Sequence, residues 1–237
     1  ISNYFIWLLM PGGKTDVNNR GPFSTDMIGM NHDYPEASWE RRREIIEAHK
    51  SYTLGLMWFY VSDPRVPEKF RDFISGWGWA KDEYPGTGGW THQLYVREAR
   101  RMTSSYVATQ ADCEGRTVVP DGIGYAAYQM DSHNCERIVV EKDGRLMVKN
   151  EGDVEKGGGS PYPISYRSVT PKREECTNLL VPVCVSSSHI AFGSIRMEPV
   201  FLELGQACGV AAALAGRGPV QDVDVSLIQK EVGFTPA

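Results

Sequence analysis

The chain has 237 residues, of which 41% are hydrophobic and 23% charged, enough for one large or two small globular domains. Twenty-five basic and 30 acidic residues give a net charge of −5, too balanced for a nucleic-acid-binding surface. Five cysteines without a C-x-x-C pair argue against a disulfide scaffold or a zinc site, so we expect no metal. No apolar run reaches the roughly 20 residues of a membrane-spanning helix, so we expect no membrane partner.

The first predicted elements are a strand over residues 1–10 and a loop over residues 11–26. The sequence ISNYFIWLLM lacks the basic region and small-residue cleavage site of a signal peptide, so we predict a buried strand. A strand that begins at the first residue suggests that the chain starts inside a larger protein. The glycines and asparagines that follow predict a surface or cleft-lining loop.

Two helices are predicted next. Asp33 and Pro35 are typical of a helix start, and the helix is expected to run to about Tyr60. Its buried face is indicated by spacings of three and four among Ile45, His49, Tyr52, Leu56 and Phe59. The charged residues 40–44 are expected to face solvent. A shorter helix through Phe70 and Ile74 follows.

The middle of the chain predicts a tryptophan and glycine-rich loop over residues 76–90 and then mostly strands. We expect extended segments at 92–102, 104–109, 125–130 and 162–169, and a hairpin over 136–152 that turns at Asp143-Gly144. In the first of these, alternation places Arg97 and Arg101 on one side, where they could fix a carboxylate or hydroxylated substrate. A solvent-facing row is the alternative.

The last third predicts a strand, a loop and a helix. Residues 178–186 form a nearly continuous apolar run, as expected for a strand buried on both faces. A polar loop over 187–195 leads to a helix that begins near Pro199 and ends at Gly216. Such a unit attracts anions through the N–H groups of the helix start, although an ordinary packing unit has the same pattern.

The last helix also carries a stripe of small residues. It consists of Gly205, Cys208, Gly209, Ala212 and Gly216. Because each glycine costs roughly 1 kcal/mol of helix stability relative to alanine, the stripe predicts close packing on another backbone.

The segment from 178 to 215 resembles the carboxy-terminal signature of the bacterial FAD-dependent oxidoreductase family. It has a Ser-x-x-His segment followed by an R-x-x-P-x-x-x-x-x-G-Q-A helix. The resemblance extends upstream through GKTDVNNRGPFSTDMIG, HQLYVREARRM and PYPISYRSVTPK. It implies an α/β fold of the glutathione-reductase type: an α+β substrate domain with a mixed or antiparallel sheet, and the end of a Rossmann-like FAD domain.

The resemblance also implies domain boundaries. The substrate domain is expected over 1–169 with a helical insertion at about 33–80, the end of the FAD domain over 170–217, and a tail over 218–237. No G-x-G-x-x-G element is present, since Gly86-Thr87-Gly88 and Gly122-Ile123-Gly124 lack the third glycine. We therefore expect this chain to be the carboxy-terminal portion of a flavoprotein whose partner is the missing dinucleotide-binding segment.

Candidate site residues follow from the resemblance and from residue chemistry. The implied FAD contacts are Ser188, His189, Ser194, Ile195, Arg196, Met197, Glu198 and Pro199. The catalytic candidates are Asp131 and His133 as acid and base, His189 as proton donor or substrate contact, and Arg97 and Arg100 near the flavin.

The resemblance implies oxidation of a C–H bond in a small polar, sugar-like substrate, with hydride passing to flavin N5. The sugar is suggested by Trp77, Trp79 and Trp90, which could stack on sugar rings or cover a small core. Two alternatives remain open. One is a carbohydrate-binding or interaction module that has lost the cofactor site, and the other is a serine-type hydrolase using Ser187 or Ser188 with His189.

Overall fold

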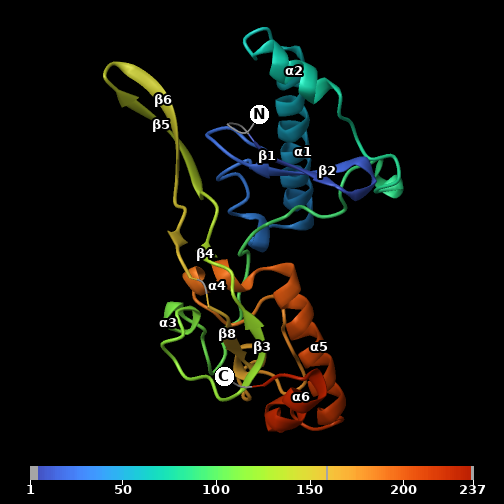
Figure 1. Ribbon diagram of the computed structural model, residues 1–237, viewed down its shortest axis with the longest axis vertical. Coiled ribbons are helices and arrows are strands. Elements are labelled where there is room, and N and C mark those ends of the chain that lie inside the picture. Colours follow the sequence, from blue (N-terminus) through green and yellow to red (C-terminus); the bar gives the residue numbers. More distant parts are fainter. Residues whose placement is uncertain (1–4, 159, 236–237) are drawn as a thin grey trace. The chain divides into compact units, whose positions relative to one another are not determined.

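The computed structural model describes residues 5–158 and 160–235. The chain forms two compact units, one made of residues 1–97 and 134–152 and the other of residues 98–133 and 153–237. Helices and small antiparallel sheets occur in the chain, which confirms the α/β class (Figure 1). The domain boundaries expected at 169 and 217 stay predictions. No described helix combines the length and apolarity needed to cross a bilayer.

The first unit opens with a hairpin of β1 (Phe5–Met10) and β2 (Lys14–Asn19), which pair antiparallel. The turn uses Gly12 and Gly13, both at positive φ, a conformation that favours glycine. The predicted loop over 11–26 is therefore wrong over Lys14–Asn19, which form β2. The polar composition of these residues had favoured a loop. The predicted burial of β1 is also wrong. Of its side chains only Phe5 is buried, because β1 lies in a two-stranded sheet.

Two helices complete the core of this unit. Ser38 caps α1 (Trp39–Ser62) by accepting a hydrogen bond from the Arg41 N–H, whereas residues 34–36 form only a 3₁₀ turn. The shorter helix predicted through Phe70 and Ile74 is α2 (Glu68–Ser75), and both side chains are buried. The core joins three elements through Phe5, Tyr60, Val66, Phe70 and Ile74.

The predicted buried face of α1 is correct in part. Ile45 and His49 are buried, and His49 Nδ1 lies 2.8 Å from the Ile45 carbonyl oxygen. Phe59 is exposed, and its neighbour Tyr60 enters the core instead. Arg41–Glu44 and Arg43–Glu40 ion pairs lie on the solvent face, as expected for the charged stretch.

A second hairpin belongs to the first unit. It pairs β5 (Glu136–Lys142) with β6 (Arg145–Glu151), and Asp143 and Gly144 both have positive φ at its turn. This confirms the hairpin prediction, because Asp-Gly is the residue pair that a type I′ turn favours.

The second unit contains two small antiparallel pairs. The strand β3 (Gly122–Ala126) pairs with β8 (Tyr162–Ser165), and β4 (Met130–Asp131) pairs with β7 (Glu155–Lys156). A single-turn helix, α3 (Gln110–Cys113), precedes them. The extended segments predicted around 125–130 and 162–169 are thus present in shortened form.

The strands predicted at 92–102 and 104–109 are not formed. Glu98 has a φ of 55°, which interrupts an extended run, and only Ala108 makes an isolated bridge, to Ser187. The alternation argument that placed Arg97 and Arg101 on one side of a strand is therefore wrong.

The buried strand predicted at 178–186 is also wrong. Leu179 and Val183 are about half exposed, and Pro182 has no N–H with which to join a ladder. The backbone bonds of this segment are isolated and form no ladder: Val181 N–H donates to the Val169 carbonyl, and Ser186 N–H donates to that of Ser168, the last residue of a 3₁₀ turn over 166–168. The apolar composition of 178–186 was not enough to make it a strand, because no described strand lies beside it to form a ladder.

Three helices follow. Residues predicted as a polar loop form α4 (His189–Ile195), which Ser188 caps by accepting from the Ala191 N–H. The helix α5 (Glu198–Ala215) is confirmed, with Pro199 in its first turn and Gly216 at its end. The last helix, α6 (Val225–Val232), packs against α5 and β3 and buries Ile228 completely.

The small-residue stripe of α5 is open rather than packed. Gly205 and Gly209 are exposed, and a Cβ at either position would meet no described atom within 4 Å. Cys208 alone of the stripe is buried. The predicted close packing is not made by the residues that the structure describes.

Gly193 has the opposite environment. A Cβ at this position in α4 would lie 2.5 Å from the Asp131 carbonyl oxygen and 3.0 Å from its nitrogen. The missing side chain is what lets α4 approach the backbone of β4.

We predict that Gly193→Ala lowers the free energy of unfolding by about 1–3 kcal/mol, the usual cost of overpacking. Gly209→Ala is the matched control, since it adds a methyl group to an exposed helical position and should stabilise the chain by roughly 0.5–1 kcal/mol. Urea unfolding followed by circular dichroism measures both. Equal effects of the two substitutions would contradict the close approach at Gly193.

Candidate functional site

The start of α5 presents unpaired backbone donors. The Met197 N–H donates to the Ile195 carbonyl, and Pro199 has no N–H. The Glu198 and Val200 N–H groups donate to no acceptor in the described part of the chain. The N–H groups of Glu198 and Val200 can therefore donate to a ligand, at the positive end of an 18-residue helix.

Arg196 lies between α4 and α5 and has a charged partner. Its side chain is only 10% exposed, and Nη2 lies 2.5 Å from Asp131 Oδ1. Its Nε is buried and has no partner among the described residues. A guanidinium that keeps one buried donor unused, beside the start of α5, is suited to an acceptor group supplied by a ligand.

Asp131 is committed to this arrangement. Its Oδ1 accepts from Arg196, and its Oδ2 accepts from the Tyr128 hydroxyl at 3.0 Å. The bond to Asp131, together with burial and the negative charge of that carboxylate, raises the pKa of Tyr128. Because both carboxylate oxygens are occupied, Asp131 is better suited to hold Arg196 than to take a proton from a substrate.

A second cluster lies at the start of α4. His189 Nδ1 is hydrogen-bonded to Glu98 Oε2, and Arg101 Nη1 lies 2.9 Å from the same oxygen. Arg101 Nε also donates to the Ser187 carbonyl at 3.2 Å. The Glu98 side chain is 13% exposed, whereas that of His189 is 45% exposed. The carboxylate is therefore held inside while the imidazole remains accessible.

The backbone of Glu98 is strained, since positive φ is uncommon for a residue with a side chain. Strain of this kind costs of order 1–3 kcal/mol and persists where surrounding contacts hold it. Here the contacts are those of the Glu98 carboxylate with Arg101 and His189.

The remaining predicted catalytic residues are Arg97, Arg100 and His133. Arg97 belongs to the first unit, where it lies 3.6 Å from Asp26 and stacks over Tyr95. Arg100 is exposed, and His133 is half-buried in the second unit. Their catalytic roles stay predictions.

Two predicted cofactor contacts have core positions. Ser194 and Ile195 are completely buried, and Ser194 accepts a hydrogen bond from the Tyr162 hydroxyl at 2.7 Å while donating to the Tyr128 carbonyl. Their side chains hold α4 in place. Ser188 caps that helix, so its hydroxyl is used as well.

Sequence reasoning missed Glu98. The alternation pattern drew attention to Arg97 and Arg101 alone, whereas the left-handed backbone of Glu98 accompanies a contact of its carboxylate with Arg101. One signal was present: Glu98 is the single acidic residue within 92–102, a stretch with three arginines.

The serine hydrolase alternative finds no support in the described residues. No serine hydroxyl there is hydrogen-bonded to His189, and the Ser187 hydroxyl contacts the Val185 carbonyl at 3.5 Å. Likewise, no group of three metal-binding side chains is found within the described ranges.

The structure thus combines a mixed fold, backbone donors at the start of α5 and charged clusters at both ends of α4. A model of the FAD dependent oxidoreductase family matches residues 1–232. The chain belongs to this family. No curated protein and no solved structure shows significant similarity to it.

We predict that Arg196→Ala weakens FAD retention about 10- to 100-fold, because a hydrogen bond to a charged group is worth about 1.5–3 kcal/mol. The measurement is the dissociation constant of apoprotein and FAD, followed by quenching of flavin fluorescence. Arg173→Ala is the control, since Arg173 forms an exposed ion pair with Asp222.

Loss of Arg196 also leaves Asp131 without its cation, and this can destabilise the fold. The double variant Arg196→Ala/Asp131→Asn removes that penalty and should still bind FAD weakly. Unchanged retention in a folded variant would rule out Arg196 as a cofactor contact.

Proposed function

We propose that the protein is an FAD-dependent oxidoreductase that oxidises a carbinol C–H bond of a small polar, sugar-like substrate, with His189 as the proton acceptor. Membership of the family supports the reaction class. The observation that carries the residue assignment is an accessible imidazole whose other nitrogen is held by a buried carboxylate.

The residues around α5 fit the cofactor. Arg196 and the N–H groups of Glu198 and Val200 would hold an electron-rich edge of the flavin. When bound, FAD would supply the two-electron acceptor that takes the hydride from the C–H bond.

His189 would take the hydroxyl proton. With an ionised Glu98, the hydrogen bond requires Nδ1 to carry the proton, so Nε2 of the neutral ring has its lone pair available. The substrate hydroxyl then gives its proton to Nε2 as the carbonyl forms.

Glu98 and Arg101 would act through His189. The Arg101 guanidinium bridges Glu98 and the Ser187 carbonyl, and Ser187 precedes the cap of α4 by one residue. The carboxylate is thus fixed relative to the helix that carries His189, which is the role of an orienting group in acid–base sites.

The first test is the absorbance spectrum of the protein purified with its natural cofactor. We expect flavin bands that bleach anaerobically on addition of glucose, galactose or cellobiose. A protein that neither carries nor binds FAD would contradict the proposed function.

The second test uses variants that keep FAD. His189→Ala should slow bleaching about 10²- to 10⁴-fold, the usual contribution of a general base, and Glu98→Gln should slow it less. His92→Ala, at an exposed position in the first unit, is the control. Slowing by His133→Ala, with His189→Ala at the wild-type rate, would transfer the role to His133.

A further inference from the structure

The first unit contains a groove of about 1000 Å³ that the redox chemistry above does not use. It lies between the β1–β2 hairpin, α1 and the segment that follows α2, and every residue that lines it falls between 7 and 83. This volume is at the upper end of the roughly 300–1,000 Å³ of small-molecule sites, so it suits a ligand of several rings.

Four indoles line the groove: Trp7, Trp58, Trp77 and Trp79. Trp7 packs edge-on against Phe73 with ring centres 5.1 Å apart and lies 5.3 Å from Trp77. These ring contacts hold the indoles of Trp7 and Trp77 in place.

The other two indoles are exposed. Trp58 is 71% and Trp79 is 56% accessible to solvent, although Trp79 is steadied by Trp90 at 5.5 Å between ring centres. Side chains this exposed do not cover a core. Large aromatic faces left in water at a concave surface are typical of a binding site.

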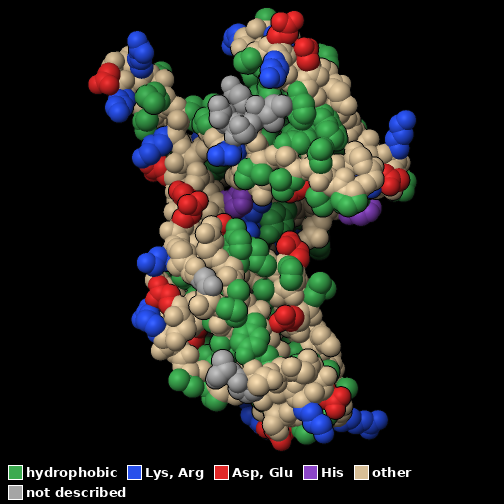
Figure 2. Space-filling view, in the orientation of Figure 1, with side chains coloured by type: hydrophobic (Ala, Val, Ile, Leu, Met, Phe, Trp, Pro, Cys, Tyr) green, Lys and Arg blue, Asp and Glu red, His purple; other side chains and the backbone are tan. Residues whose placement is uncertain are grey.

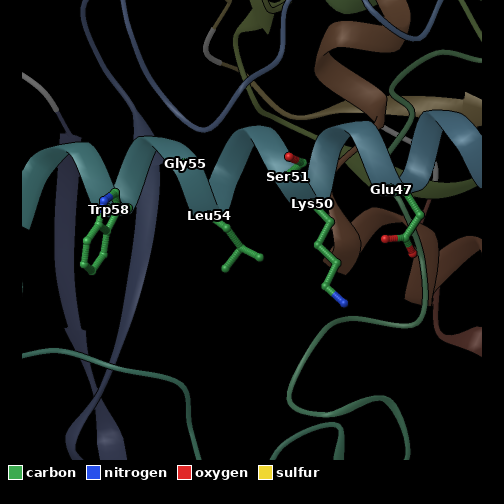
Figure 3. A pocket seen from close by; sticks show the side chains of 6 residues that line it. All are labelled: Glu47, Lys50, Ser51, Leu54, Gly55 and Trp58. Carbon is green, nitrogen blue, oxygen red and sulfur yellow. The ribbon is translucent and has the colours of Figure 1, made fainter.

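The groove continues along the outer face of α1. Figure 3 shows Trp58, Leu54, Lys50 and Glu47 projecting from the same side of this helix, and Leu54 and Trp58 also line the larger groove. Hydrophobic side chains gather on the surface around α1 and α2 (Figure 2). Leu54 and Trp58 therefore form the apolar end of this side of α1, and Lys50 and Glu47 form its charged end.

The rim of the groove is polar and electrically balanced. Its charged residues are two lysines, Lys14 and Lys81, and two acids, Asp82 and Glu83. Lys14 Nζ lies 3.0 Å from Asp82 and also contacts Glu83, and the hydrogen bond from Lys14 lowers the pKa of Asp82. Threonine hydroxyls at 15, 25 and 53 add further donors and acceptors.

We propose that this tryptophan groove binds a neutral oligosaccharide. Sugar rings present apolar C–H faces that pack on indoles, and their hydroxyls match the carboxylates, ammonium groups and hydroxyls of the rim. The balanced rim charge disfavours an anionic ligand, since no net positive charge is available to it. The inference rests on the sugar-like substrate class of the proposed function and gives that class a binding place.

The test is isothermal titration of the protein with cellohexaose, xylohexaose and maltohexaose, alongside a galacturonic acid hexasaccharide. We expect binding of at least one neutral hexasaccharide, weakened about 10-fold by Trp58→Ala and by Trp79→Ala. Neither substitution should unfold the protein, because both side chains are mostly exposed. Trp39→Ala is the matched control, since Trp39 is 74% exposed on α1 and does not line the groove.

Failure to bind any neutral hexasaccharide overturns the proposal, as does binding of the galacturonic acid hexasaccharide alone or binding that Trp58→Ala and Trp79→Ala leave unchanged. Anaerobic bleaching of the flavin by glucose, galactose or cellobiose is measured on the same samples. Bleaching without hexasaccharide binding rejects the groove and leaves the proposed function standing. Hexasaccharide binding without bleaching supports the groove and counts against the oxidoreductase reaction.

Discussion

The attachment of α4 to β4 is the constraint on which the candidate site depends. Gly193 brings the two backbones together, the Ser194 hydroxyl bonds to the Tyr128 carbonyl, and Arg196 pairs with Asp131. One seven-residue helix thereby positions His189 at its start and Arg196 just after its end, about 10 Å apart along the axis. A shift of α4 would displace the proton acceptor and the proposed cofactor contact together.

The local parts of this arrangement could be predicted from the sequence. Asp143-Gly144 specifies its own turn, and Pro199 and Gly216 bound α5, because these signals act within a few residues. Ser188 was also a usable signal, since serine is a favoured helix cap. Gly193 and Ser194, however, are residues more typical of a loop, so α4 was predicted as one. Helix α2 was predicted through Phe70 and Ile74, with Pro67 just before its first residue as a further local signal.

What could not be predicted depends on partners distant in sequence. The apolar run at 178–186 has the composition of a strand, yet a strand needs a neighbouring strand. Its backbone bonds go to residues outside the described strands, such as Val169, Ser168 and Ala108. The role of Glu98 depends on a positive φ and on His189, 91 residues away. Neither leaves a periodic pattern, so composition and spacing could not reveal the cluster.

The two units concentrate different chemistry. In the second, charged groups are partly buried and specifically paired, as proton transfer and cofactor binding require. In the first, the groove offers broad aromatic area with balanced charge, as recognition of a neutral ligand requires. The proposed ligand groove and the proposed redox site lie in different units, so separate substitutions test each of them.

Hydrogen–deuterium exchange of the FAD-loaded protein, compared with the apoprotein prepared from it, tests the central claim most directly. The account predicts slower amide exchange at Glu198 and Val200, where unpaired N–H groups start α5, and unchanged exchange across α6 (Val225–Val232). Equal exchange at Glu198 and Val200 in the two forms would contradict the assignment of α5 to the cofactor.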